Sequence, residues 1–254
     1  MKIFILESLK QDDPKTGKLI HNYLDSKGAQ NEYHIFKSKS ELLDICEIVK
    51  IGSAAEKYKP FIHFYCHGNE DGIGAIKSDE SVELITWGEI SQAFRDIYLA
   101  CKQKSVICMS SCHGFNVIKL VSRCEPCPYE NVCGSFEKIS FSDSYNAYTK
   151  FYDLILSGKS IHDSALEIHE DPTFPNLKFI GLDSKTLFNL TIDGYLKKEC
   201  TQAKLIEKKE YCGKIIERRG PLNKYQIEYL NYTFSLEGQK QILQNCAKIF
   251  FSLK

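Results

Sequence analysis

No apolar run in this chain of 254 residues approaches the length of about 20 residues that a membrane-spanning helix requires. The apolar start, from Met1 to Leu6, is too short for the core of a secretory signal and is followed by Glu7 and Lys10. We therefore expect a cytoplasmic protein that has no membrane partner.

An excess of charge is also missing, because 33 lysines and arginines oppose 33 aspartates and glutamates. A balanced chain has no global field that attracts polyanions. The charge runs at Lys197–Lys209 and Arg218-Arg219 are short, and such runs normally form a solvated face. We expect no nucleic-acid partner.

A second cysteine pair, which a structural zinc site usually needs, is absent beside Cys124-x-x-Cys127 and Cys133. The 11 cysteines are odd in number and lack a secretory signal, which favours free thiols in a reducing compartment. We expect no metal and no other cofactor, with zinc at these three cysteines as the minor alternative.

Short apolar runs that end on small or polar residues recur along the chain, and they are typical of strands buried on both faces. Helical patterns separate them, which predicts an α/β fold with a mostly parallel sheet. One helix, which starts at Ser40, should be interrupted near Gly52-Ser53. A small hairpin, formed by Ile73–Ile76 and Ser81–Ile85, should lie beside the sheet. The predicted strands of the sheet are Lys2–Ser8, Glu32–Phe36, Phe61–Cys66, Val106–Met109, Asn131–Phe136 and Leu177–Leu182.

The last part of the chain has a different pattern. Helices are predicted at Pro221–Phe234 and Glu237–Leu253. We expect two domains: residues 1–189 form the sheet domain, and residues 190–254 form a mainly helical extension packed on its core.

Two of the predicted strands end on reactive side chains. Phe61–Cys66 runs into His67-Gly68, and Val106–Met109 runs into Ser110-Ser111-Cys112. Parallel strands end at the same edge of a sheet and lie about 4.8 Å apart. The pattern therefore predicts that an imidazole and a thiol face each other, as a nucleophile and its proton acceptor do.

Such a pair can cleave an acyl bond if main-chain N–H groups also stabilise an oxyanion. A thiol is partly ionised near neutral pH, so a dyad of Cys112 and His67 suffices. Gly68 has no side chain to block approach to its amide, and Cys112 supplies the second amide of an oxyanion hole. The alternative is that Cys112 is one more structural cysteine. His63 is expected to be a core histidine.

The order of strand, His-Gly, strand and Ser-Cys-His at His67-Gly68 and Ser111-Cys112-His113 resembles the caspase-like cysteine peptidases, such as metacaspases, legumain and separase. Later segments, Phe151-Tyr152-Asp153-Leu154, Gly158-Lys159-Ser160 and Ala165-Leu166, resemble the helix pair of bacterial CHAT-type members. The resemblance covers roughly residues 1–182. It implies a three-layer αβα sandwich with six strands in the order 2-1-3-4-5-6, the last one antiparallel.

The resemblance also places substrate-binding residues. The residue two before the nucleophile helps to form the primary pocket, and here it is Ser110 where related enzymes that cut after basic residues often have an acid. An acid from the end of the fifth strand, Glu137 or Asp143, would favour a basic residue before the cut. Both are also ordinary candidates for surface or capping roles.

The sequence thus predicts a cytoplasmic cysteine endopeptidase that acts on a protein or peptide substrate. The resemblance implies a regulated protease, with a partner protein, in bacterial antiviral defence or cell death. The alternative is a catalytically inactive adaptor that keeps the fold for binding. No residue pattern indicates the oligomeric state.

Overall fold

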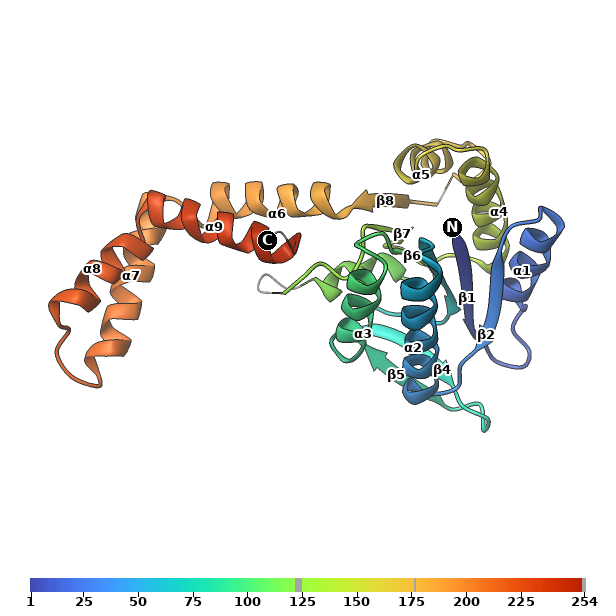
Figure 1. The fold of residues 1–254 in the computed structure, drawn as a ribbon, viewed down its shortest axis with the longest axis horizontal. Coiled ribbons are helices and arrows are strands. Elements are labelled where there is room, and N and C mark those ends of the chain that lie inside the picture. Colours follow the sequence, from blue (N-terminus) through green and yellow to red (C-terminus); the bar gives the residue numbers. More distant parts are fainter. Residues whose placement is uncertain (122–124, 176, 253–254) are drawn as a thin grey trace. The chain divides into compact units, whose positions relative to one another are not determined.

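The computed structural model describes residues 1–121, 125–175 and 177–252 (Figure 1). These residues form two compact units. The first comprises residues up to 121 and residues 127–184, and the second comprises residues 185–252 with Glu125 and Pro126. In the described ranges, no helix combines the length and the apolar character that a membrane span requires. The predicted packing of the extension on the core stays a prediction.

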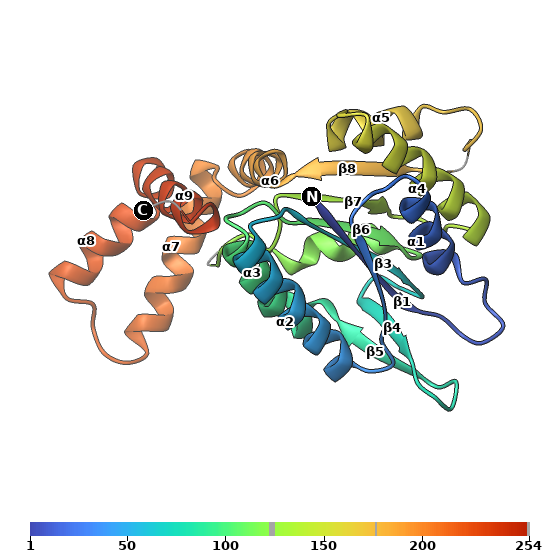
Figure 2. The same cartoon turned by 45° about the vertical axis from the view of Figure 1, so that its right-hand side comes forward.

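The first unit is built on a six-stranded sheet (Figure 2). Its first five strands are parallel, and the last is antiparallel to its neighbour. The strands in spatial order are β2 (Asn31–Ile35), β1 (Lys2–Ser8), β3 (Pro60–Cys66), β6 (Val106–Ser110), β7 (Asn131–Ser135) and β8 (Phe179–Asp183). Numbered along the whole chain, this order is 2-1-3-6-7-8 and differs from the predicted 2-1-3-4-5-6. The difference is that β4 (Gly72–Ile76) and β5 (Val82–Thr86), the separate hairpin, take two numbers and do not join the sheet.

Helices cover both faces of the sheet, as the predicted α/β class requires (Figures 1 and 2). One face packs against helices α1, α4 and α5 through a single cluster of buried side chains that includes Ile5, Tyr65 and Tyr148. On the other face, the ring of Phe64 in β3 lies 5.9 Å from that of Phe94 in α3. The helices are α1 (Thr16–Ser26), α2 (Lys39–Glu56), α3 (Trp87–Ala100), α4 (Phe141–Leu156) and α5 (Ile161–His169).

Helix α2 is continuous through Gly52-Ser53, so the predicted interruption there is wrong. The reason for the glycine is packing, because a methyl group at position 52 would overlap the hydroxyl of Tyr58. Glycine costs a helix only about 1 kcal/mol, and the surrounding contacts of the 18-residue helix outweigh that cost.

Two short elements flank the carboxyl edge of the sheet. The predicted hairpin is present as β4 (Gly72–Ile76) and β5 (Val82–Thr86). A 3₁₀ helix, η1 (Gly114–Leu120), follows the second reactive motif.

The second unit is helical. Its helices are α6 (Ser184–Lys198), which starts at the end of the first unit, α7 (Gln202–Glu217), α8 (Lys224–Thr233) and α9 (Leu236–Phe250). The sequence missed α6 and α7, because few of their apolar residues are buried and the hydrophobic pattern is weak. Helix α8 starts after the predicted Pro221, because Asn223 and Gln226 form a capping box at its N-terminus.

Candidate functional site

His67 and Cys112 leave the sheet at the same edge. Strands β3 and β6 are adjacent and parallel, and Tyr65 lies opposite Ser110 in their register. Two residues beyond Tyr65 the chain reaches His67, and two residues beyond Ser110 it reaches Cys112. The predicted placement of both side chains at the carboxyl edge follows from this register.

The main chains after the two strands touch. A methyl group at position 68 would lie 2.8 Å from the carbonyl oxygen of Cys112 and 3.1 Å from the Cβ of Ser111. Real Cβ atoms are essentially never found under 3.0 Å from such an atom. Gly68 is therefore required for the loop of the histidine to lie against the loop of the cysteine.

The two reactive side chains also share a neighbouring segment, the approach to helix α4. The ring of His67 packs edge-on against that of Phe141, with 6.3 Å between centroids. The sulfur of Cys112, which is partly exposed, lies 3.9 Å from the carbonyl oxygen of Ile139. His67 and Cys112 thus border the same three residues of the chain.

A carboxylate that the sequence did not single out holds the imidazole. Asp13 Oδ2 lies 2.8 Å from His67 Nε2 and also accepts a hydrogen bond from the N–H of Lys10, at 2.9 Å. Burial raises the pKa of the Asp13 carboxyl, but the hydrogen bonds from His67 and Lys10 outweigh it and hold that pKa below its usual 3.8. An ionised carboxylate only accepts hydrogen bonds, so the proton of this contact lies on Nε2 of His67. Among the described residues no group bonds Nδ1, which leaves that nitrogen available as a proton acceptor.

Asp13 lies in the loop that follows β1, the neighbour of β3 in the sheet. In sequence, Asp12-Asp13-Pro14 has the composition of a turn and nothing more. The available signal was position: an acid just beyond a third parallel strand reaches the same edge as His67 and Cys112.

Two main-chain amides at this edge, those of Gly68 and Cys112, have no acceptor in the part of the chain that the structure describes. The bridge between residues 68 and 73 uses the carbonyl of His67, which accepts from Gly74 at 2.9 Å, and the amide of Asn69, which donates to Gly72 at 3.0 Å. That pattern leaves the amide of Gly68 unused. Among the described residues, neither Gly68 nor Cys112 donates a hydrogen bond from its amide.

Ser110 faces the core. Its hydroxyl lies 2.7 Å from Nε2 of His63, whose Nδ1 lies 2.9 Å from the hydroxyl of Tyr152. His63 is fully buried, and burial lowers its pKa well below 6.5, so it is neutral. The prediction that His63 is a core histidine is confirmed. Ser110 is the last residue of β6, and its hydroxyl is bonded to His63 in the core. That hydroxyl therefore points away from the place where the predicted substrate-binding role would need it.

The two acids predicted for substrate binding also have other partners. Glu137 is paired with Lys178, with 2.5 Å between Oε1 and Nζ. Asp143 belongs to the capping turn of α4, because its carboxylate accepts from the hydroxyl of Ser140 at 2.8 Å. The main chain of Glu137 does reach the segment of Cys112, because its carbonyl accepts from the amide of His113 at 3.1 Å.

The other cysteines of the sheet differ from Cys112. Cys66 and Cys108 are buried, and burial raises the pKa of both thiols. Cys133 faces Cys108 with 3.2 Å between the sulfurs. The thiol of Cys127 is buried against the carbonyl of Tyr129, and burial raises its pKa to about 12.

The minor zinc hypothesis depends on a residue outside the described part of the chain, Cys124. Over the described ranges, no three side chains of the types that bind metal gather into a group.

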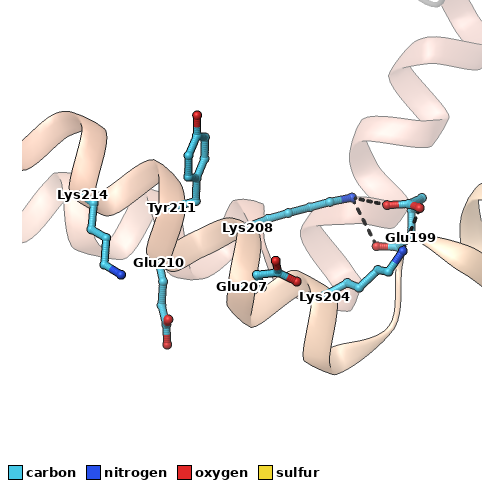
Figure 3. Close-up of a pocket in the computed structure, with 7 residues that line it drawn as sticks. All are labelled: Glu199, Lys204, Glu207, Lys208, Glu210, Tyr211 and Lys214. Carbon is cyan, nitrogen blue, oxygen red and sulfur yellow. Dashed lines mark hydrogen bonds and ion pairs between the residues drawn. The ribbon is translucent and has the colours of Figure 1, made fainter.

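A hollow of about 570 Å³ on the helical unit is a poorer candidate (Figure 3). Two of its lysines, Lys204 and Lys208, both bind Glu199, at 2.9 Å and 3.0 Å. These hydrogen bonds lower the pKa of Glu199 to about 2. These two cations are satisfied by a neighbouring acid, and none of the described residues that line the hollow is a cysteine, serine or threonine. Its lining residues are Glu199, Lys204, Glu207, Lys208, Glu210, Tyr211 and Lys214.

Comparison of the chain with protein-family models gives no match, and comparison with curated proteins gives none either. The geometry at the carboxyl edge is therefore the basis for assigning a function.

Proposed function

We propose that this protein is a cysteine endopeptidase of the caspase-like fold, with Cys112 as nucleophile, His67 as general base and Asp13 as the residue that orients His67. The observation that carries the proposal is the direct contact between the loops of His67 and Cys112, enforced by Gly68. The parallel sheet, with its antiparallel edge strand, supports the same assignment.

The chemistry follows from the free groups at the edge. His67 Nδ1 takes the proton of the Cys112 thiol, and the sulfur attacks the carbonyl carbon of the scissile peptide bond. The amides of Gly68 and Cys112 stabilise the negative oxygen of the tetrahedral intermediate. When the C–N bond breaks, His67 gives its proton to the leaving amine, and the acyl group stays on sulfur as a thioester.

Water then hydrolyses the thioester. His67 accepts a proton from the attacking water, the C–S bond breaks, and the imidazolium returns that proton to the leaving thiolate. The thiol is restored and the new carboxyl end of the substrate is released. Throughout, the ionised Asp13 keeps the Nε2 proton in place and stabilises the imidazolium that forms twice in the cycle. A regulated role in defence or cell death belongs to this proposal as its biological setting.

The test is labelling of the whole chain with iodoacetamide, read residue by residue by mass spectrometry. We expect fast labelling of Cys112 that slows in His67→Ala. Cys212 and Cys246 are also partly exposed and serve as internal standards of an ordinary thiol. A digest of a peptide library by the wild type and by Cys112→Ala then reports cleavage. Equal labelling of Cys112 and Cys212, without cleavage, would favour the inactive adaptor.

A further inference from the structure

The hairpin β4–β5 is attached to the candidate site. Gly74 donates its amide to the carbonyl of His67 at 2.9 Å, and Gly72 accepts from Asn69 at 3.0 Å. On its other side, β4 forms the antiparallel ladder with β5. The order in space is therefore the His67 loop, then β4, then β5, and β5 is the outer strand of the hairpin.

The outer edge of β5 is open. In an antiparallel ladder, successive residues point their N–H and C=O groups alternately to one side and the other. The main-chain groups of Gly72 and Gly74 point toward the His67 loop, so those of Ile73 and Ala75 form the hydrogen bonds to β5. On β5 the groups of Val82 and Leu84 therefore point away from β4. Within the described residues, β5 pairs with β4 alone.

The side chains at this edge are also exposed. Val82 is 54% exposed and Leu84 is 45% exposed, although both are apolar. A bare strand edge with apolar side chains is a template for a further strand, and proteins that do not use such an edge usually shield it. Added strands obtain affinity from main-chain hydrogen bonds and specificity from side chains.

The charge around this edge is negative. One lysine, Lys77, stands among the carboxylates of residues 69–89, and Lys39 of helix α2 pairs with one of them, Glu89, at 2.8 Å. Lys37 lies near Ser78, and Lys119 donates to the carbonyl of Glu70 at 2.7 Å. These cations leave an excess of acid on the hairpin. The carboxylates are Glu70, Asp71, Asp79, Glu80, Glu83 and Glu89.

We propose that the outer edge of β5 binds an extended, lysine- or arginine-rich segment of a protein as an added strand, and that, if the proposed peptidase function holds, this protein is the substrate. The open N–H and C=O groups select an extended backbone. The surrounding carboxylates select cationic side chains, and Val82 and Leu84 contact the apolar parts of the strand. The hairpin is bonded to the His67 loop, so a strand docked on β5 lies three strand spacings, about 14 Å, from that loop.

Binding can be measured without catalysis, in the full chain with Cys112→Ala. The probe is a fluorescein-labelled peptide of about ten residues that alternates lysine and threonine, since threonine favours strands. Its anisotropy should rise with protein concentration, and the binding should weaken as salt is added. A peptide with glutamate in place of lysine should bind at least about tenfold more weakly, equivalent to 1.4 kcal/mol.

The decisive variant is Leu84→Pro. Proline is tolerated on an edge strand where the N–H faces outward, so the ladder with β4 stays intact while the outer donor is lost. Leu84→Thr keeps the donor and should weaken binding less. Ile35→Thr, on the edge strand β2 of the six-stranded sheet, removes an apolar side chain that is 57% exposed and should have no effect.

Equal affinity of the lysine peptide for Leu84→Pro and its parent, or equal binding of the glutamate peptide, would overturn the proposal. Circular dichroism of each variant separates loss of binding from loss of folding. Because the assay uses a chain without the nucleophile, its outcome is independent of whether Cys112 is catalytic. Conversely, the iodoacetamide experiment is independent of the hairpin.

Discussion

Replacing Asp13 by asparagine should slow catalysis without changing the fold. The side chain of Asp13 is 19% exposed and that of His67 is 44% exposed, so water partly screens their 2.8 Å contact. A hydrogen bond to a charged group contributes about 1.5–3 kcal/mol when buried. With screening we expect about 1–2 kcal/mol of transition-state stabilisation, which corresponds to a loss of about 5- to 30-fold in kcat/KM.

The loss should fall on kcat and not on KM, because Asp13 acts through His67 and does not contact substrate. An asparagine side chain still accepts from the amide of Lys10 through its oxygen, so the turn from residue 10 to residue 13 is kept. The assay is hydrolysis of a fluorogenic peptide chosen from the library digest, together with the rate of alkylation of Cys112. Asp13→Glu should recover part of the activity.

The matched control is Asp12→Asn, since Asp12 is exposed and one residue away. It removes the same charge from the same loop without touching the imidazole. If Asp12→Asn and Asp13→Asn reduce kcat/KM equally, the effect is one of general charge. If neither has any effect, Asp13 does not orient the base and the enzyme works as a dyad.

Three further predictions concern the same region. Gly68→Ala should reduce kcat/KM by about a hundredfold, because its methyl group would push the His67 loop from the Cys112 carbonyl; wild-type activity in this variant would contradict the proposed contact. In the native protein, Cys66 and Cys108 should be alkylated far more slowly than Cys112, because they are buried and their thiol pKa values are raised; timed mass spectrometry measures this. Below pH 6.5 the His63 ring binds a proton in the unfolded chain but stays neutral in the folded protein, because it is buried. The free energy of unfolding, measured in urea, should therefore fall by up to about 1.4 kcal/mol for each pH unit below 6.5. A His63→Gln variant should lack this contribution to the pH dependence.

The sheet could be predicted from the sequence because its strands are apolar throughout. Phe61–Cys66 and Val106–Met109 are continuous buried runs, and each ends at the residue where the structure also ends the strand or one residue before it. The last strand was placed two residues early. Leu177 is apolar because it is buried in the core next to a turn, where its amide donates to Phe174, and it is not part of the strand.

The residues that the sequence did not reveal are those whose role depends on contacts made at long range. Asp13 and His67 are separated by 54 positions, and no periodic pattern connects them. Gly52 was taken for a helix breaker, although it is there to make room for Tyr58. Composition can locate a turn or a glycine, but only the packed structure shows which side chain occupies the space beside it.

The site is a consequence of strand register more than of its loops. Strands β1, β3 and β6 are adjacent and parallel, and the segments that follow them supply Asp13, His67 and Cys112 respectively. A slip of β6 by one residue would move Cys112 by about 3.3 Å along the strand and turn the side chains of β6 to the opposite face of the sheet. Every side chain of β3 and β6 is buried, so such a slip would misplace packed side chains on both faces of the sheet and separate Ser110 from His63, and it is strongly disfavoured. The same burial that makes these strands recognisable in the sequence therefore keeps the segments of His67 and Cys112 next to each other at one edge of the sheet.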